Sequence, residues 1–223
     1  MALYNQSLEI TERIGDVQTK AATLHNLANI YANKGEVDEA IALYNQSLSI
    51  EERIGNVQGK AATLHELAGI YDDKGEVDEA IALFNQSLEI KERIGDVAGK
   101  AATLHNLAAI YANKGNVDEA IALYNQSLEI TEPIGNVAGK AATLHNLGHI
   151  YANKGNVDEA IALFNQSLEI FERIGNVRDK ATTLQNLASI YAENGKSMKR
   201  SHFLISLWKY LKALVMTKAK RRR

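Results

Sequence analysis

The chain repeats itself every 40 residues. The segment AATLHNLANIYANKGEVDEAIALYNQSLSIEERIGNVQGK at 21–60 returns with few changes at 61–100, 101–140 and 141–180, and partial copies occupy 1–20 and 181–195. A fixed period of this length indicates stacked supersecondary units, none of which can bury its apolar face alone. The repeat therefore predicts an array that offers a binding surface, and it argues against a single central core.

Composition excludes several classes of protein. The chain contains no cysteine, which excludes disulfide frameworks, thiolate metal sites and cysteine nucleophiles. No charged region followed by an apolar stretch opens the sequence, so we expect no secretory signal and a cytoplasmic location. The apolar stretch FLISLWKYLKALVM at 203–216 contains two lysines. It is shorter than the roughly 20 residues that span a bilayer.

Charge divides the chain into two parts. All 27 acidic residues lie within 1–195 with 15 basic ones, a formal charge of −12, whereas 196–223 carries ten basic residues and no acidic one. The repeats should repel a phosphate backbone, and the tail could attract one. Nucleic acid is therefore not an expected partner of the repeats, and a membrane contact is expected only through the tail.

Each copy predicts two helices. In the copy that begins at Lys20, apolar or small residues recur at helical spacing from Leu24 to Tyr31, and Gly35 ends that helix. A second helix is expected to run through Ala40 to about Ile54 and to end at Gly55. In the copies at 115–121 and 155–161 the segment reads GNVDEAI. There the asparagine is expected to cap the second helix, as Asn116 could with Glu119.

These residues resemble the tetratricopeptide repeat. In the copy at 21–60, a Leu-x-x-Leu-Ala-x-x-Tyr pattern from Leu24 to Tyr31 precedes Gly35 and the Ala40-x₃-Tyr44 pair, and the pattern recurs in the later copies. The 40-residue form is similar to the repeats of kinesin light chains and of spindle-orientation adaptors. The resemblance implies an all-α, right-handed superhelical solenoid of antiparallel helix pairs.

The expected organisation follows from the repeat. It comprises an array at 1–195 (partial copy 1–20, full copies 21–60, 61–100, 101–140 and 141–180, partial copy 181–195), a basic amphipathic helix at 196–217 that caps the array, and a disordered basic tail at 218–223. Pro133 stands where sister copies have arginine. We expect it to end or bend its helix a turn early.

The resemblance also implies a peptide-binding site. In the family, two adjacent positions of the first helix face the concave groove, and asparagines there hold the backbone of an extended peptide. A third position of the same helix varies from copy to copy and could tune pockets along the groove. The candidate groove residues are His25, Asn26, Asn29, His65, Glu66, His105, Asn106, His145, Asn146, His149, Gln185 and Asn186. The alternative interpretation is that these are solvated polar residues of an amphipathic helix.

Other chemistry is not expected. Four of the six histidines, at 25, 65, 105 and 145, recur once per copy. Helix packing separates them by roughly 8–10 Å, which is too far for a shared zinc ion. GNVQGKA at 55–61 lacks the spacing and the Ser or Thr of a phosphate-binding loop. We therefore expect no catalytic residue, no metal, no cofactor and no enzyme activity.

The sequence leaves more than one function open. The main hypothesis is a protein–protein interaction scaffold that takes a peptide or a partner helix in its groove. For an acidic ligand, binding is then expected to tighten as pH falls through about 6.5, where histidine gains charge. The alternatives are nucleic-acid or anionic-membrane binding through the basic tail, and a sensor or scaffold fragment of a larger signalling protein. Self-association through the open repeat ends is a further possibility.

Overall fold

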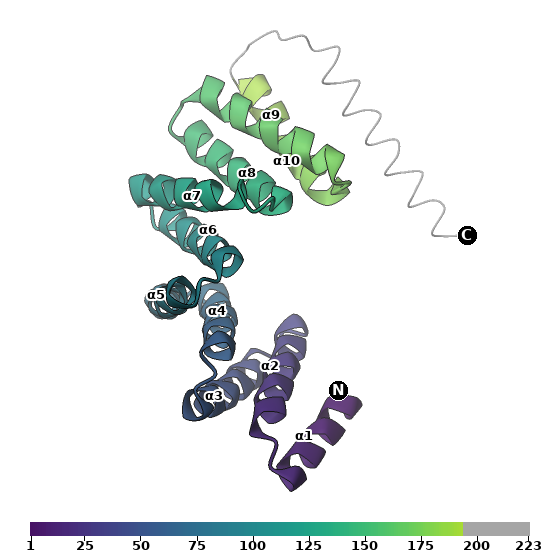
Figure 1. The fold of residues 1–223 in the computed structure, drawn as a ribbon. Coiled ribbons are helices and arrows are strands. Elements are labelled where there is room, and N and C mark those ends of the chain that lie inside the picture. Colours follow the sequence, from purple (N-terminus) through teal and green to yellow (C-terminus); the bar gives the residue numbers. More distant parts are fainter. Residues whose placement is uncertain (194–223) are drawn as a thin grey trace, which may run out of the picture. The chain divides into compact units, whose positions relative to one another are not determined.

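A computed structural model describes residues 1–193 of the chain, and all of its regular elements are helices (Figure 1). The described part divides into two compact units, Met1–Ile130 and the segment that begins at Thr131. Its helices are α1 (Ala2–Ile14), α2 (Val17–Asn33), α3 (Val37–Ile54), α4 (Val57–Asp73), α5 (Val77–Ile94), α6 (Val97–Asn113), α7 (Val117–Thr131), α8 (Val137–Asn153), α9 (Val157–Arg173) and α10 (Val177–Glu193). The expected capping helix at 196–217 and tail at 218–223 lie outside the described residues.

The predicted helix ends are confirmed. Gly35 follows α2 with φ 78°, and Gly55 ends α3 with φ 70°. Both angles lie in the left-handed region that glycine adopts without steric strain. Pro133 also acts as predicted, because α7 stops at Thr131 whereas its counterparts α3 and α5 continue to Ile54 and Ile94.

The caps differ from the prediction. Asn156, the counterpart of Asn116, precedes α9 without any side-chain hydrogen bond to the helix, so the expected asparagine cap is wrong for that copy. Side chains cap the first helices instead. Asp16 accepts from the backbone N–H of Thr19 at 3.0 Å, and Asn56 accepts from that of Gly59 at 3.0 Å. Each bond satisfies one of the unpaired donors at a helix start.

In three copies the first helix packs against the second helix of the same copy, α2 on α3, α4 on α5 and α8 on α9. The residues at these crossings are small, and Ala28, Ala40, Ala68 and Ala80 are all fully buried. Without bulky side chains at the crossing, the large aromatic residue of the second helix fits against the first helix. Tyr44, Phe84, Tyr124 and Phe164 are the largest side chains of this core, each at most 2% exposed.

A buried serine joins the two helices of every complete copy. The Ser47 hydroxyl donates to the Ala21 carbonyl at 2.8 Å, and Ser87, Ser127 and Ser167 donate to Ala61, Ala101 and Ala141 at 2.7, 3.0 and 2.8 Å. These serines belong to the repeated NQS tripeptide and are at most 1% exposed. The tripeptide therefore recurs for packing, since its hydroxyl satisfies a carbonyl of the neighbouring helix.

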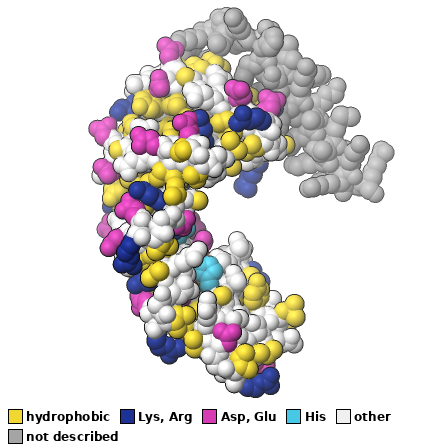
Figure 2. All heavy atoms as spheres, in the orientation of Figure 1, with side chains coloured by type: hydrophobic (Ala, Val, Ile, Leu, Met, Phe, Trp, Pro, Cys, Tyr) yellow, Lys and Arg dark blue, Asp and Glu magenta, His cyan; other side chains and the backbone are white. Residues whose placement is uncertain are grey.

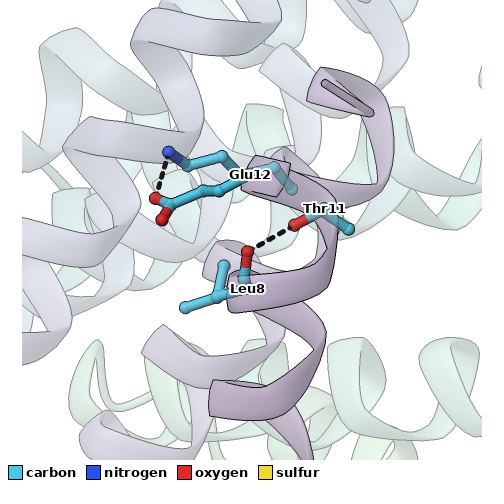
Figure 3. A network of polar contacts seen from close by, with 4 residues as sticks. Leu8, Thr11 and Glu12 are labelled. Atoms are coloured by element: carbon cyan, nitrogen blue, oxygen red, sulfur yellow. Dashed lines mark hydrogen bonds and ion pairs between the residues drawn. The ribbon is translucent and has the colours of Figure 1, made fainter. Parts of the chain in front are cut away.

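An ion pair recurs where one copy meets the next. Lys20 pairs with Glu12 at 2.6 Å, Lys60 with Glu52 at 2.8 Å, Lys100 with Glu92 at 2.7 Å and Lys180 with Glu172 at 2.7 Å. Figure 3 shows the first of these pairs beside Thr11, whose hydroxyl donates back to the Leu8 carbonyl at 3.0 Å. Because their glutamates are exposed, each pair adds less than about 1 kcal/mol to stability.

One buried position near the end of the second helix differs between copies. It is occupied by Thr11, Glu51, Lys91, Thr131 and Phe171, and each of these side chains is at most 5% exposed. Glu51 accepts from Ser47 and Thr63 through Oε1, whereas Oε2 is buried with no hydrogen-bond partner among the described residues. Burial raises the pKa of Glu51. Lys91 donates to Thr103 at 2.9 Å, and burial lowers its pKa.

The surface of the described part is polar and mixed in charge. Figure 2 shows acidic and basic side chains interspersed with apolar ones over the face in view. No helix among residues 1–193 is long and apolar enough to cross a membrane.

A core substitution in the middle of the first unit should reduce stability far more than one at its first helix. Leu107 is 1% exposed and belongs to the main core, whereas Leu3 on α1 is 80% exposed. Leu107→Ala should lower the free energy of unfolding by roughly 2–5 kcal/mol, and Leu3→Ala should leave it nearly unchanged. Urea unfolding followed by circular dichroism measures both. Equal losses would contradict the stacked arrangement.

Replacing the buried carboxyl should stabilise the protein. Glu51→Thr introduces the residue of the sister positions 11 and 131 and removes an unpaired buried oxygen, so we expect a gain of about 1–3 kcal/mol near neutral pH. Because the folded-state pKa of Glu51 is raised, the gain should shrink as pH falls and the carboxyl protonates in both states. The exposed neighbour substitution Glu52→Thr is the control, and a loss of stability in Glu51→Thr would refute this account.

Candidate binding face on the first helices

The first helices of successive copies lie next to one another. Within the first unit α2 contacts α4 and α4 contacts α6, while no comparable contact joins the second helices α3 and α5. In the second unit α8 contacts α10. When one row of helices is in contact and the other is spread, the row in contact lies on the inner side of the curve. Within the first unit, the first helices therefore form the inner wall.

The solvent-facing stripe of this wall is called the first-helix face below. Its side chains are exposed or half-buried and recur at helical spacing. In the first unit they are Ala22, Asn26, Asn29 and Asn33 on α2, Ala62, Glu66, Gly69 and Asp73 on α4, and Ala102, Asn106, Ala109 and Asn113 on α6. In the second unit they are Ala142, Asn146, His149 and Asn153 on α8, and Thr182, Asn186, Ser189 and Glu193 on α10.

The candidate histidines lie at the edge of this face and bond to the next copy. His25 Nδ1 lies 2.9 Å from Thr63 Oγ1, His65 Nδ1 lies 3.0 Å from Thr103 Oγ1, and His145 Nδ1 lies 2.8 Å from Thr183 Oγ1. Each bond joins consecutive first helices across 38 residues. These three histidines are therefore neither simply solvated nor wholly free to bind a ligand, because Nδ1 of each ring already bonds a threonine of the next copy.

The partners of the threonines fix the histidine tautomer. Thr103 and Thr183 donate their hydroxyl protons to the carbonyls of Gly99 and Asp179, at 2.9 and 2.8 Å. The histidine must then be the donor, through Nδ1–H, which leaves Nε2 as an acceptor. Asn106 Nδ2 lies 3.3 Å from His65 Nε2, which is consistent with this assignment.

Asn186 makes the corresponding contacts in the second unit. Its Nδ2 lies 3.4 Å from His145 Nε2 and 2.7 Å from His149 Nε2. The candidate histidines and asparagines of neighbouring copies are thus brought together. Gln185, which replaces the histidine in the last described copy, is exposed.

Each histidine ring also packs edge-on against the aromatic residue of its own second helix. The ring centroids of His25 and Tyr44 are 5.4 Å apart, those of His65 and Phe84 5.1 Å, those of His105 and Tyr124 5.3 Å, and those of His145 and Phe164 5.4 Å. Edge-to-face contacts at this separation add to the stability of a core. The ring therefore serves both the copy it belongs to and the next one.

Burial lowers the pKa of these histidines. It lowers the pKa of His25, His105 and His149, and it lowers that of His65 and His145 to about 4, with smaller contributions from Lys91 and His149 respectively. The expectation that these groups gain charge near pH 6.5 is therefore wrong. At neutral pH the face presents uncharged imidazoles.

The third position of the face is also in contact with the second helix. Asn29 accepts a hydrogen bond from the Tyr44 hydroxyl, and the His149 ring lies 5.3 Å from that of Phe164. Gly69 fills the same place on α4, and a Cβ atom built on it would meet no atom within 4 Å. On α2 and α8 the side chain at this position thus contacts the aromatic ring; on α4 no side chain does so, although Phe84 is still only 1% exposed.

The charge of the face is concentrated on α4. Glu66 and Asp73 stand there at positions where α2 and α6 carry asparagine, and both side chains are exposed by their accessible surface. Poor hydration nevertheless raises the pKa of Glu66, with Lys91 acting in the opposite direction. The exposed surface of Glu66 and its raised pKa are compatible because the carboxylate reaches solvent within a concave wall, where protein surrounds it on several sides.

Cavities lie elsewhere, at the junctions between copies. Their volumes are about 580 Å³ beside Thr11 and Arg53, 410 Å³ beside Glu51 and Arg93, and 420 Å³ beside Thr131 and Arg173. Each is lined by the glutamate and lysine of a junction ion pair together with other polar side chains, and none lies on the first-helix face, so we do not identify these cavities as the binding site. Among residues 1–193 no group of three or more His, Cys, Asp or Glu could hold a metal ion.

Comparison with known families agrees with this geometry. The tetratricopeptide repeat model matches the chain at residues 2–53, 19–93, 59–132, 99–152 and 139–197. The chain belongs to the tetratricopeptide repeat family. This confirms the resemblance drawn from Leu24, Leu27, Ala28, Tyr31, Ala40 and Tyr44, and it confirms an all-helical repeat solenoid.

Solved structures show the same fold. BtubC (BKLC) from P. vanneervenii superposes with a TM-score of 0.83 at 22% identity, covering 96% of this chain and 90% of its own. A protein of kinesin light chain type from Podosopora anserina, built of nearly identical TPR-like repeats, gives 0.69 at 26% identity, with 86% and 95% covered. The apo form of RapI gives 0.75 at 16% identity, with 96% and 84% covered. No curated protein matches the sequence.

The buried imidazoles should make the fold sensitive to acid. An unfolded histidine has a pKa of about 6.5, and the folded-state pKa of His65 and His145 is about 4. Their contribution to stability is therefore complete above about pH 6.5 and is lost as pH falls towards 4. The slope reaches at most about 1.4 kcal/mol per pH unit for each histidine.

The test uses the residue that the chain itself carries at position 185. His65→Gln with His145→Gln should lose less stability than the parent between pH 7 and pH 5, measured by urea unfolding at both values. Asp96, Asp179, Lys91 and His149 act electrostatically on the two rings and are present in both proteins, so the difference isolates the histidines. Identical losses would refute the buried neutral imidazole.

Proposed function

We propose that this chain is a protein-interaction scaffold that binds an extended peptide along its first-helix face and catalyses no reaction. The family is one of protein-interaction repeats in general, which supports the broad assignment. The observation that carries the finer one is the recurrence of an amide at the same place on the first helices of each unit, at Asn26 and Asn106 in the first unit and at Asn146 and Asn186 in the second. This spacing offers one polar contact per copy along the wall.

Amide side chains suit this task because each can donate to a peptide carbonyl and accept from a peptide N–H. Asn26 is exposed and makes no hydrogen bond within residues 1–193. Asn106 shares one amide proton with His65, which orients the side chain and leaves its oxygen available. The imidazoles then serve mainly to hold and orient the amides, and they keep consecutive helices in register.

The direct test is selection of peptides on the purified protein. The immobilised chain is exposed to a displayed library of random twelve-residue peptides, and the strongest synthetic peptide is measured by calorimetry. Asn26→Ala with Asn106→Ala should weaken that peptide at least tenfold, because each missing amide leaves a peptide group unpaired at roughly 1–3 kcal/mol. The melting temperature should change little, since neither amide is buried.

The matched control removes two amides from the second helices. Asn45 and Asn85 are exposed on α3 and α5, so Asn45→Ala with Asn85→Ala should leave affinity unchanged. If both double variants lose affinity equally, or if the control alone does, the binding site lies outside the first-helix face. If no peptide is enriched over an empty support, peptide binding itself is refuted.

A further inference from the structure

We propose that the α4 part of the first-helix face is a subsite for a basic side chain, lysine or arginine, of the bound peptide. This inference rests on the proposed function and names the chemistry of one position within that site. Two features carry it: an acidic side chain at Glu66 that makes no hydrogen bond or ion pair within residues 1–193, and an open space over Gly69. They occur together on α4 alone among the first helices of the first unit.

Within residues 1–193, Glu66 makes neither a hydrogen bond nor an ion pair, although it is surrounded closely enough for poor hydration to raise its pKa. The nearby cation, Lys91, is 5% exposed and donates to Thr103 instead. A carboxylate that is poorly hydrated and unpaired gains more from an incoming cation than one in open water.

The space beside this carboxylate is shaped by a missing side chain. Gly69 follows Glu66 by three residues, which places it on the same side of the helix. Its sisters Asn29 and His149 contact the aromatic residue of the second helix. A Cβ atom at Gly69 would meet nothing within 4 Å, so a ligand side chain can enter where the other copies place their own.

The floor of that space is the surface of α4 itself, because Phe84 is 1% exposed and closed to a ligand. Phe84 lacks the hydroxyl group that Tyr44 and Tyr124 carry, and the His65 ring packs edge-on against it at 5.1 Å. Lysine and arginine combine an aliphatic stem with a charged end. In this subsite the stem lies over the open helix surface at Gly69, and the charged end reaches Glu66.

The charge pattern of the first unit favours one polarity at this position. On α2 and α6 the corresponding stripes carry no ionised side chain, and on α4 the stripe carries Glu66 and Asp73. Acidic side chains are repelled there, and the neutral imidazoles add no positive charge that would offset the repulsion. The copies at 21–60 and 101–140 would thus contact peptide backbone without regard to side-chain charge, whereas the copy at 61–100 would select a basic side chain.

The experiment repeats the library selection on the parent chain and on Glu66→Asn, which installs the sister residue. Peptides selected on the parent should be enriched in lysine or arginine at one position, and this enrichment should disappear on Glu66→Asn. Glu79→Asn is the control, since Glu79 is exposed on α5 and its removal changes net charge equally. The control should retain the enrichment.

A double-mutant cycle then measures the contact itself. One selected peptide is synthesised with its basic residue and with norleucine in its place, and both are measured against the parent and Glu66→Asn. The norleucine peptide should bind the parent about tenfold more weakly and bind Glu66→Asn with nearly the same affinity as the basic peptide. Gly69→His, with the residue of position 149, should weaken the basic peptide while the protein stays folded by circular dichroism.

The outcomes separate the two proposals. If no peptide is enriched on the parent, the proposed peptide-binding function fails and the subsite fails with it. If peptides are enriched and depend on Asn26 and Asn106, but no coupling between the basic residue and Glu66 is found, the subsite alone is overturned. Coupling that Glu79→Asn shares would point to general electrostatic attraction, and it would also overturn the subsite.

Discussion

The close approach of the two helices within each copy is the constraint on which the structure depends. Alanines at the crossing, such as Ala28 and Ala40, let one large aromatic ring per copy fit against the first helix. Gly148 shows how little room remains, because a Cβ atom there would lie 3.0 Å from the Phe164 ring. This packing places the histidine beside the ring and its neighbouring asparagine towards solvent, and so it positions the candidate site.

Much of the fold could be predicted from the sequence because its determinants are local. Helical periodicity, the glycines after each helix and Pro133 act within a few residues, and the structure confirms them. The cap expected for the GNVDEAI segments is wrong at Asn156 because the pattern fits two geometries. The capping bonds run instead from Asp16 and Asn56 at the preceding loops, where the Gly-Asp and Gly-Asn pairs were a usable signal.

The candidate site was harder to predict because its decisive contacts join residues 26 or 38 positions apart. The serine of NQS bonds a carbonyl 26 residues earlier, and the histidine bonds a threonine 38 residues later. Helical periodicity could place His65 beside the polar stripe of its helix, but it could not show that Nδ1 is bonded to Thr103. It also missed the buried position of Glu51 and Lys91, where variation between copies looks like surface variation.

The histidine–threonine bond has a consequence for how such a chain can change in length. Every described copy supplies a threonine at the receiving position, from Thr23 and Thr63 through Thr103 and Thr143 to Thr183. At this bond, a copy that carries the histidine can therefore be followed by any other described copy. A loss or gain of 40 residues would preserve this bond at the junctions and would alter the order of the selective and the general copies. The number and the order of the copies can thus change which ligands are recognised, even when the sequence of each copy stays the same.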